Sequence, residues 1–160
     1  MPFESTATRL WKRLPADERL LAAQTLIAEQ AVETLGPAIF AIAQARRMRP
    51  QSARVMPQDQ QAKALAGIVS PGEAVASSLL VALHVGHRRP LLGAFLDACQ
   101  IPHEDGILTE AADGVTLTTE VASAAVQKLE GQFPREQIDV YLNTLWLQDP
   151  ERWGTLASVG

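Results

Sequence analysis

Residues 70–99 contain the most apolar window of the chain and read SPGEAVASSLLVALHVGHRRPLLGAFLDAC. Pro71 followed by Glu73 predicts a helix start, because proline suits the first helical position and an acid complements the positive end of the helix dipole. Gly86 then interrupts the pattern, and a second apolar helix resumes after the short link VGHRR. We therefore predict a central antiparallel helix hairpin over about 71–100 that forms the middle of the core.

A helix-start pattern of an apolar residue, a proline and then an acid occurs elsewhere in the chain. It recurs at Leu14-Pro15-Ala16-Asp17, Met56-Pro57-Gln58-Asp59 and Phe133-Pro134-Arg135-Glu136. Apolar residues at helical spacing follow these starts, and the scarcity of aromatics, at 5%, favours helices over sheets. The sequence therefore predicts an all-α fold of about seven helices. One of them runs from Pro15 to Leu35, and the next restarts at Gly36-Pro37.

The length of 160 residues suits one compact domain that buries roughly two-thirds of its unfolded surface. No linker or low-complexity segment divides the chain. We therefore predict a single all-α domain over 1–160, a compact bundle whose ends, 1–13 and 154–160, are loosely ordered.

Several features bear on the cellular compartment. The N-terminal stretch MPFESTATRLWKRLPADERL carries charges where an export signal would be apolar, so we expect no such signal. The most apolar window, Val75 to Val85, is about half of the roughly twenty residues that a membrane helix needs. The single cysteine, Cys99, excludes an intrachain disulfide and fits a reducing compartment. We expect a cytoplasmic protein with no membrane segment.

The net charge of -4 is unevenly distributed along the chain. Residues 1–63 carry nine Lys/Arg against six Asp/Glu, a net charge of +3, whereas residues 64–160 carry five against twelve, a net charge of -7. Such polarity could steer association between two copies or with another partner. The alternative interpretation is an ordinary solvated surface without a binding role.

The densest group of acid–base side chains follows the second apolar helix, in the stretch QIPHEDGIL over residues 100–108. His103, Glu104 and Asp105, with Asp97 upstream, could line a pocket for a small molecule or a hydrolytic reaction. The structural interpretation is a single helical turn that starts after a proline and stops at Gly106. We prefer the structural interpretation, because this stretch repeats the helix-start pattern.

A metal site or a cysteine nucleophile is disfavoured by spacing. His84 and His87 lie at the start of a helix that separates them by roughly 16 Å from His103, so the three histidines cannot share an ion. Cys99 falls on the apolar stripe of the same helix, and a buried thiol is a poor nucleophile. We find no cofactor motif and predict no metal, no cofactor and no catalytic residue.

The strongest charge cluster consists of Arg46, Arg47, Arg49 and Arg54. Such a cluster could bind phosphate groups or nucleic acid. Nucleic-acid binding is the weaker interpretation, because the cluster lacks interleaved aromatics and the estimated pI of the chain is 5.3. Arginines at the end of a helix also complement its dipole.

These patterns together favour a non-enzymatic helical interaction or regulatory protein. We expect its partner to be a second copy of the chain, forming a homodimer, or another protein. The tryptophans either pack the chain ends onto the bundle, which we prefer, or anchor a partner. They are Trp11, Trp146 and Trp153.

Overall fold

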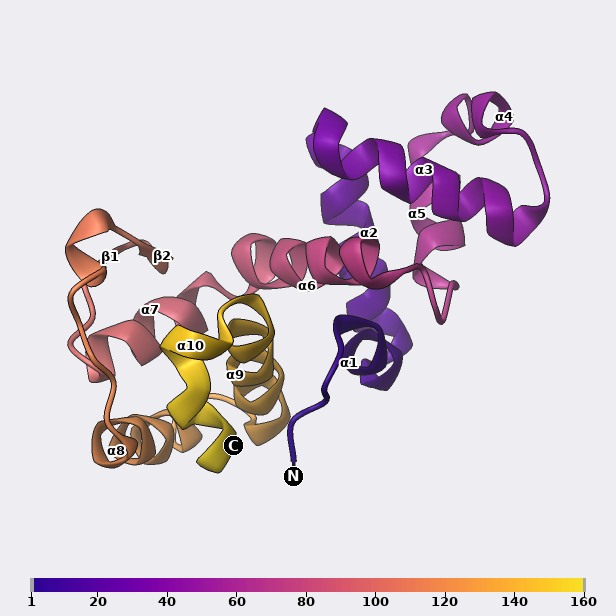
Figure 1. Ribbon diagram of the computed structural model, residues 1–160. Coiled ribbons are helices and arrows are strands. Elements are labelled where there is room, and N and C mark those ends of the chain that lie inside the picture. The colour runs from indigo at the N-terminus through magenta and orange to yellow at the C-terminus, as the bar shows by residue number, and fades with distance from the viewer. Residues whose placement is uncertain (1, 160) are drawn as a thin grey trace. The chain divides into compact units, whose positions relative to one another are not determined.

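The structure is a computed structural model that describes residues 2–159, and it is all-α (Figure 1). Contacts divide the described chain into two compact units. Residues 6–87 form the first unit, which we call the basic unit because it has nine Lys/Arg against six Asp/Glu, a net charge of +3. The described part of residues 1–5 and 88–160 forms the second, which we call the acidic unit because it has five against twelve, a net charge of -7.

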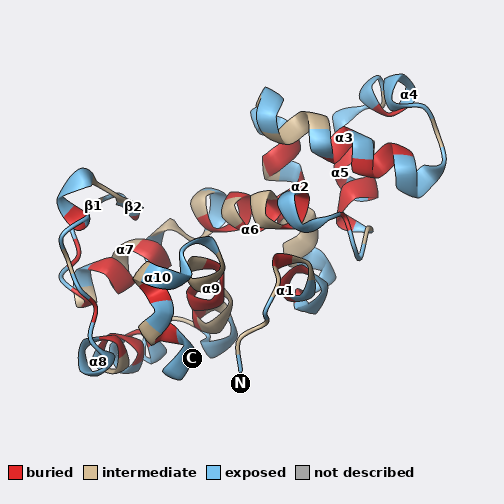
Figure 2. Ribbon diagram, in the orientation of Figure 1, coloured by how far each residue is buried: buried red, intermediate tan, exposed pale blue. Residues whose placement is uncertain are grey.

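The basic unit contains six helices in chain order. They are α1 (Ala7–Arg13), α2 (Ala16–Glu29), α3 (Val32–Arg46), α4 (Pro50–Arg54), α5 (Gln58–Ala66) and α6 (Glu73–His87). Helix α2 packs on α5 and α6, while α1 packs on α6 and α4 packs on α3. Trp11 of α1 is fully buried and donates its indole N–H to the carbonyl of Ile68 at 2.9 Å. Figure 2 shows the buried faces of these helices in red and most of α4 exposed.

The acidic unit contains four further helices, two short 3-10 helices and a two-stranded sheet. They are α7 (Arg89–Ala98), β1 (His103–Glu104), β2 (Ile107–Leu108), η1 (Glu110–Ala112), α8 (Thr119–Glu130), α9 (Arg135–Gln148), α10 (Pro150–Trp153) and η2 (Gly154–Ser158). Phe95 is fully buried at the centre of this core. Its ring centroid lies 5.7 Å from that of Tyr141, in a T-shaped pair, and 6.3 Å from that of Trp153.

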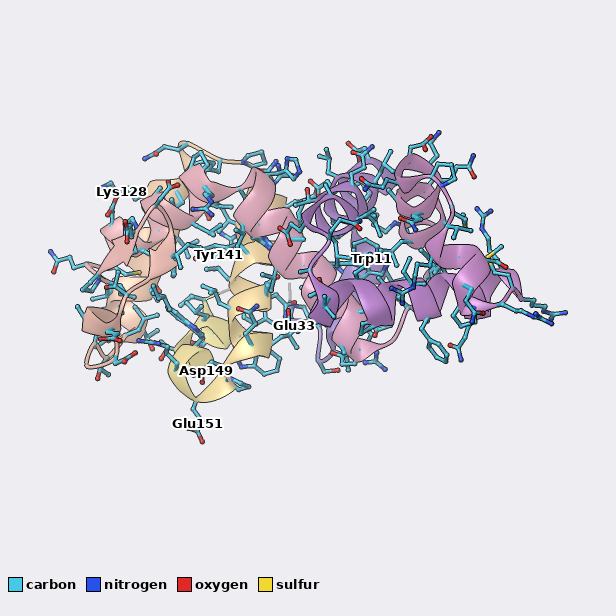
Figure 3. The ribbon with its side chains drawn as sticks, turned by 90° about the horizontal axis from the view of Figure 1, so that it is seen from above. Trp11, Glu33, Lys128, Tyr141, Asp149 and Glu151 are labelled. Atoms are coloured by element: carbon cyan, nitrogen blue, oxygen red, sulfur yellow. The ribbon has the colours of Figure 1, made fainter. Side chains whose placement is uncertain are left out.

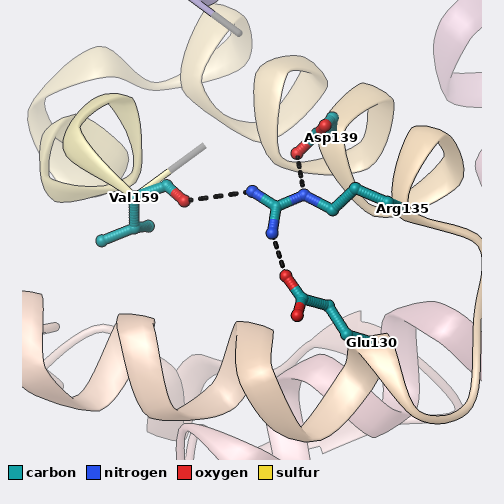
Figure 4. A network of polar contacts seen from close by, with 4 residues as sticks. All are labelled: Glu130, Arg135, Asp139 and Val159. Atoms are coloured by element: carbon teal, nitrogen blue, oxygen red, sulfur yellow. Dashed lines mark hydrogen bonds and ion pairs between the residues drawn. The ribbon is translucent and has the colours of Figure 1, made fainter.

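A polar network on the surface of the acidic unit joins α8, α9 and the C-terminal segment (Figure 4). Arg135 donates to Glu130, to Asp139 at 2.9 Å and to the carbonyl oxygen of Val159 at 3.5 Å. The side chains of Arg135 and Glu130 are 44% and 43% exposed, so their ion pair contributes little to stability.

The all-α prediction is confirmed, and the seven predicted helices correspond to the seven long ones. The described residues form ten α-helices, and the three additional ones, α1, α4 and α10, are short. A short helix has too few residues to display a clear apolar period, so its existence depends on packing and capping. Thr6 caps α1 and Asp149 caps α10 through their side-chain oxygens.

The predicted antiparallel hairpin is corrected by the structure. Helix α6 belongs to the basic unit and packs on α1, α2 and α3, whereas α7 belongs to the acidic unit and packs on α8 and β1. Only Arg88 separates α6 from α7, which is shorter than the two to five residues that join an antiparallel helix pair. Each helix is therefore central to a different core.

The boundary between α2 and α3 also differs from the prediction. Helix α2 ends at Gln30, which adopts a left-handed conformation with φ of 51°, and α3 has begun before Gly36-Pro37. Pro37 lies near the start of α3, where the loss of one backbone hydrogen bond does not break the helix.

The chain ends are ordered where the structure describes them, contrary to the expectation of loose termini. Helix α1 buries Trp11, and the C-terminal segment buries Trp153 and Leu156. Trp146 is partly buried, with its ring centroid 6.0 Å from that of Phe3. All three tryptophans therefore pack within their units. None of the helices in the described part of the chain is long and apolar enough to cross a membrane.

Candidate functional site

The arginine cluster lies at the junction of α3 and α4 in the basic unit. Arg46 is the last residue of α3, and Arg47 caps that helix in a left-handed conformation with φ of 53°. Arg49 is the N-cap residue of α4, and Arg54 is the last residue of α4. The structure thus holds all four predicted anion-binding residues at three helix ends, the C-terminal end of α3 and both ends of the short helix α4.

All four arginine side chains are exposed. Among the described residues, none of the four forms an ion pair or a side-chain hydrogen bond. Four like charges within nine residues of chain repel one another, and no carboxylate of the described chain lies within ion-pair distance of them.

A favourable interaction with helix dipoles explains the positions of only some of these arginines. Arg46, Arg47 and Arg54 lie at helix C-termini, where a positive charge is favourable. Arg49 lies at the N-cap of α4, where a positive charge is unfavourable. The stability of the basic unit therefore does not account for the cluster as a whole.

Two large apolar side chains are exposed on or next to the helices that carry the arginines. Phe40 of α3 is 54% exposed and precedes Arg46 by six residues on the same helix. Val55 directly follows Arg54 and is 80% exposed. We call these two residues and the four arginines the arginine surface. It combines positive charge with apolar area, as binding surfaces for acidic protein partners do.

The residues of the predicted 97–105 corner lie on α7 and a β-hairpin. The predicted helical turn after Pro102 is wrong, because His103 pairs with Leu108 and Glu104 with Ile107 in two antiparallel strands. Asp105 and Gly106 join the strands with φ of 50° and 84°. Two positive φ angles in a two-residue loop define a type I′ turn, and Asp-Gly is a preferred sequence for it.

His103 connects the hairpin to α7. Its Nδ1 accepts a hydrogen bond from the backbone N–H of Gly106 at 3.0 Å, which assigns the proton to Nε2. Nε2 in turn donates to the Asp97 carboxylate at 2.6 Å. Both ring nitrogens are therefore engaged in holding the turn, an arrangement that favours a structural role over a general base.

The remaining acids of this corner do not converge on His103. Asp105 pairs instead with Arg89, whose guanidinium donates to its carboxylate at 3.1 Å. The side chain of Glu104 is exposed on β1. The structure thus brings together Asp97 and His103 but leaves Glu104 and Asp105 outside that pair.

Cys99 and His84 are buried where helices pack together. Cys99 is buried in the core of the acidic unit, and burial raises the pKa of its thiol to about 11. His84 is buried in α6 and its Nδ1 lies 2.7 Å from the carbonyl oxygen of Leu80. No group of three or more His, Cys, Asp or Glu residues in the described chain is arranged to hold a metal ion.

A groove in the acidic unit was missed by sequence reasoning. It has a volume of about 570 Å³ and lies between residues 113–117 and α10. Val115 and Leu117 contribute apolar wall, and three acids line it. Figure 3 labels two of these acids, Asp149 and Glu151, and shows Glu151 projecting from the ribbon. The third acid, Asp113, is 36 residues from Asp149, and no local pattern links them.

Comparison with protein-family models, with curated proteins and with solved structures found no match to this chain. The geometry of the arginine surface and of the groove therefore provides the basis for a functional proposal.

Proposed function

We propose that this chain is a non-enzymatic interaction protein that binds an acidic protein surface through the arginine surface. The observation that carries the proposal is the exposure of four arginines without an ion-pair partner in the described chain, together with the exposed Phe40 and Val55. A partner with carboxylates would relieve the repulsion between the arginines, and its apolar side chains would cover the two exposed hydrophobic residues.

A protein partner fits this surface better than a nucleic acid does. Phosphate backbones are recognised by positive charge, and single strands are also stacked on aromatic rings. The arginine surface has one aromatic residue, Phe40, and one aliphatic residue, Val55.

We place this interaction in the cytoplasm. The proposal is supported by the single cysteine, Cys99, whose buried thiol is compatible with a reducing compartment.

The test uses a defined acidic probe. A short fluorescent peptide of alternating Glu and Leu is titrated with the protein, and fluorescence anisotropy reports binding at low and at physiological salt. We expect saturable binding that weakens with salt, because exposed charges are screened within about 8 Å at physiological ionic strength. A peptide with Gln in place of Glu should bind at least about tenfold more weakly, a change of about 1.4 kcal/mol.

A matched pair of variants locates the binding surface. Replacing Arg46, Arg47 and Arg49 with Gln removes three positive charges from the arginine surface. Replacing three exposed lysines with Gln removes the same charge elsewhere. These lysines are Lys12, Lys63 and Lys128. We expect only the arginine variant to lose affinity for the acidic peptide. An equal loss of affinity in both variants would contradict a localised binding site.

A further inference from the structure

The division of charge follows the structural units and suggests a partner. The basic unit carries a net charge of +3 and the acidic unit -7. Two copies of this chain therefore present surfaces of opposite sign to each other. Complementary potentials increase the rate of encounter and determine the orientation of docking.

The groove of the acidic unit has the complementary chemistry to the arginine surface. Asp113 is 76% exposed at its side chain, and Asp149 and Glu151 are exposed nearby. Val115 and Leu117 add apolar area between these acids. The arginine surface has the opposite charge, and it carries the exposed Val55 directly after Arg54 and the exposed Phe40 on α3.

The size of the groove suits a side chain as an anchor. Its volume of about 570 Å³ lies within the range of pockets that hold small molecules. Interfaces take most of their binding energy from a few aromatic or arginine residues that enter such pockets. Arg152, on the wall of the groove, donates to the carbonyl oxygen of Ala112 at 2.6 Å and lies 3.6 Å from Asp113. It therefore fixes the wall, while Asp113, whose side chain is still 76% exposed, and Glu151 face solvent and can pair with a partner.

We propose that the arginine surface of one copy docks on the acidic groove of a second copy. This inference rests on the proposed function and names its partner. The two surfaces differ, so the contact is heterologous, and it either closes into a ring of copies or continues as a chain. Phe40 and Val55 are covered at the centre of the contact, and the arginines and acids pair around them.

The test uses complementary charge reversal in the full-length chain. One variant carries Arg46→Glu, Arg47→Glu and Arg49→Glu, and the other carries Asp113→Lys and Glu151→Lys. Asp149 is left unchanged because it caps α10, accepting a hydrogen bond from the backbone N–H of Arg152 at 3.1 Å. Sedimentation velocity measures association at concentrations on the order of 10⁻⁴ M, above the dissociation constants of most specific interfaces.

We expect the wild-type chain to self-associate and high salt to weaken this association. Each reversed variant alone should dissociate, with a loss of affinity of about tenfold or more. An equimolar mixture of the two variants should associate again, because both contacts then join opposite charges. A variant with Lys12→Glu, Lys63→Glu and Lys128→Glu has the same net charge as the arginine variant and should associate as the wild type does.

Three outcomes would overturn the inference. They are a wild-type chain that stays monomeric, reversed variants that associate as strongly as wild type, and a mixture that remains dissociated although both variants melt cooperatively. Binding of the acidic peptide distinguishes a failure of the self-association proposal from a failure of the proposed function. If the peptide binds but the chain does not self-associate, only the second copy is rejected as the partner. If neither binding is observed, the arginine surface is rejected as an interaction surface.

Discussion

Glu4 and Asn143 exchange two hydrogen bonds across 139 positions of the chain. The backbone N–H of Glu4 donates to Asn143 Oδ1 at 2.7 Å, and Asn143 Nδ2 donates to the carbonyl oxygen of Glu4 at 3.0 Å. Asn143 is 2% exposed. Its side-chain amide satisfies the backbone N–H and C=O groups of Glu4, as the backbone of a neighbouring strand would do in a β-sheet. The pair joins the N-terminal segment to α9 of the acidic unit.

Removal of this amide should destabilise the acidic unit. We expect Asn143→Ala to lower the free energy of unfolding by about 1–3 kcal/mol, because it removes both part-buried hydrogen bonds between Asn143 and the backbone of Glu4. Urea denaturation followed by circular dichroism measures the change. The same substitution in a chain lacking residues 1–5 should cost less, and an equal cost in both chains would contradict the pairing.

Glu73 caps α1 from the start of α6 and should make stability depend on pH. Its carboxylate accepts from the backbone N–H of Ala7, and from the backbone N–H and the hydroxyl of Thr8 at 3.2 and 2.9 Å. Partial burial acts to raise the pKa of Glu73, but these hydrogen bonds outweigh it and hold the pKa below its usual value. The carboxylate therefore contributes stability above the pKa of the unfolded state, and that stability is lost as pH falls through the lower folded pKa.

We expect Glu73→Gln to lower the melting temperature at neutral pH and to change it little at pH values below the folded pKa. The effect at neutral pH should be about 1 kcal/mol or less, because the group is mostly exposed. Thermal melts across a pH series provide the measurement. Glu104→Gln removes the same charge at an exposed position of β1, away from α1, and serves as the control.

Gly106 should not tolerate a side chain. Its φ of 84° is strained for any other residue, and an added Cβ would lie 2.8 Å from Cβ of Leu92 in α7. We expect Gly106→Ala to cost at least about 1–2 kcal/mol from the backbone conformation alone, with the close contact adding to it. Gly114→Ala is the matched control, because a Cβ there meets nothing within 4 Å. Equal melting temperatures for the two variants would disprove the type I′ turn.

Cys99 should be unreactive in the native protein. It is 5% exposed, and burial raises the pKa of its thiol to about 11, so the thiolate is scarce at neutral pH. We expect labelling by a thiol reagent at pH 7.5 to proceed only as fast as the acidic unit opens, and to be complete at once in denaturant. Rapid labelling of the folded chain would show that Cys99 is accessible.

Much of the helical structure could be predicted from local sequence. Pro15, Pro57 and Pro134 each directly precede the helix that the pattern predicts, because capping and first-turn electrostatics act within a few residues. Leu80 and Phe95 are buried as their spacing indicates. The hairpin at Asp105 and Gly106 was instead predicted as the end of a helical turn, because its two-residue strands are too short to show an alternating pattern.

The sequence by itself thus determined the all-α class, the long helices and the apolar faces that they bury, because propensity, capping and periodicity are properties of neighbouring residues. Only the tertiary structure decided which helices share a core, separating α6 from α7 although one residue joins them. It also brought Asp113 and Glu151 to one groove and left the four arginines without an ion-pair partner in the described chain. These outcomes depend on contacts through space between distant segments, which no local pattern of residues encodes.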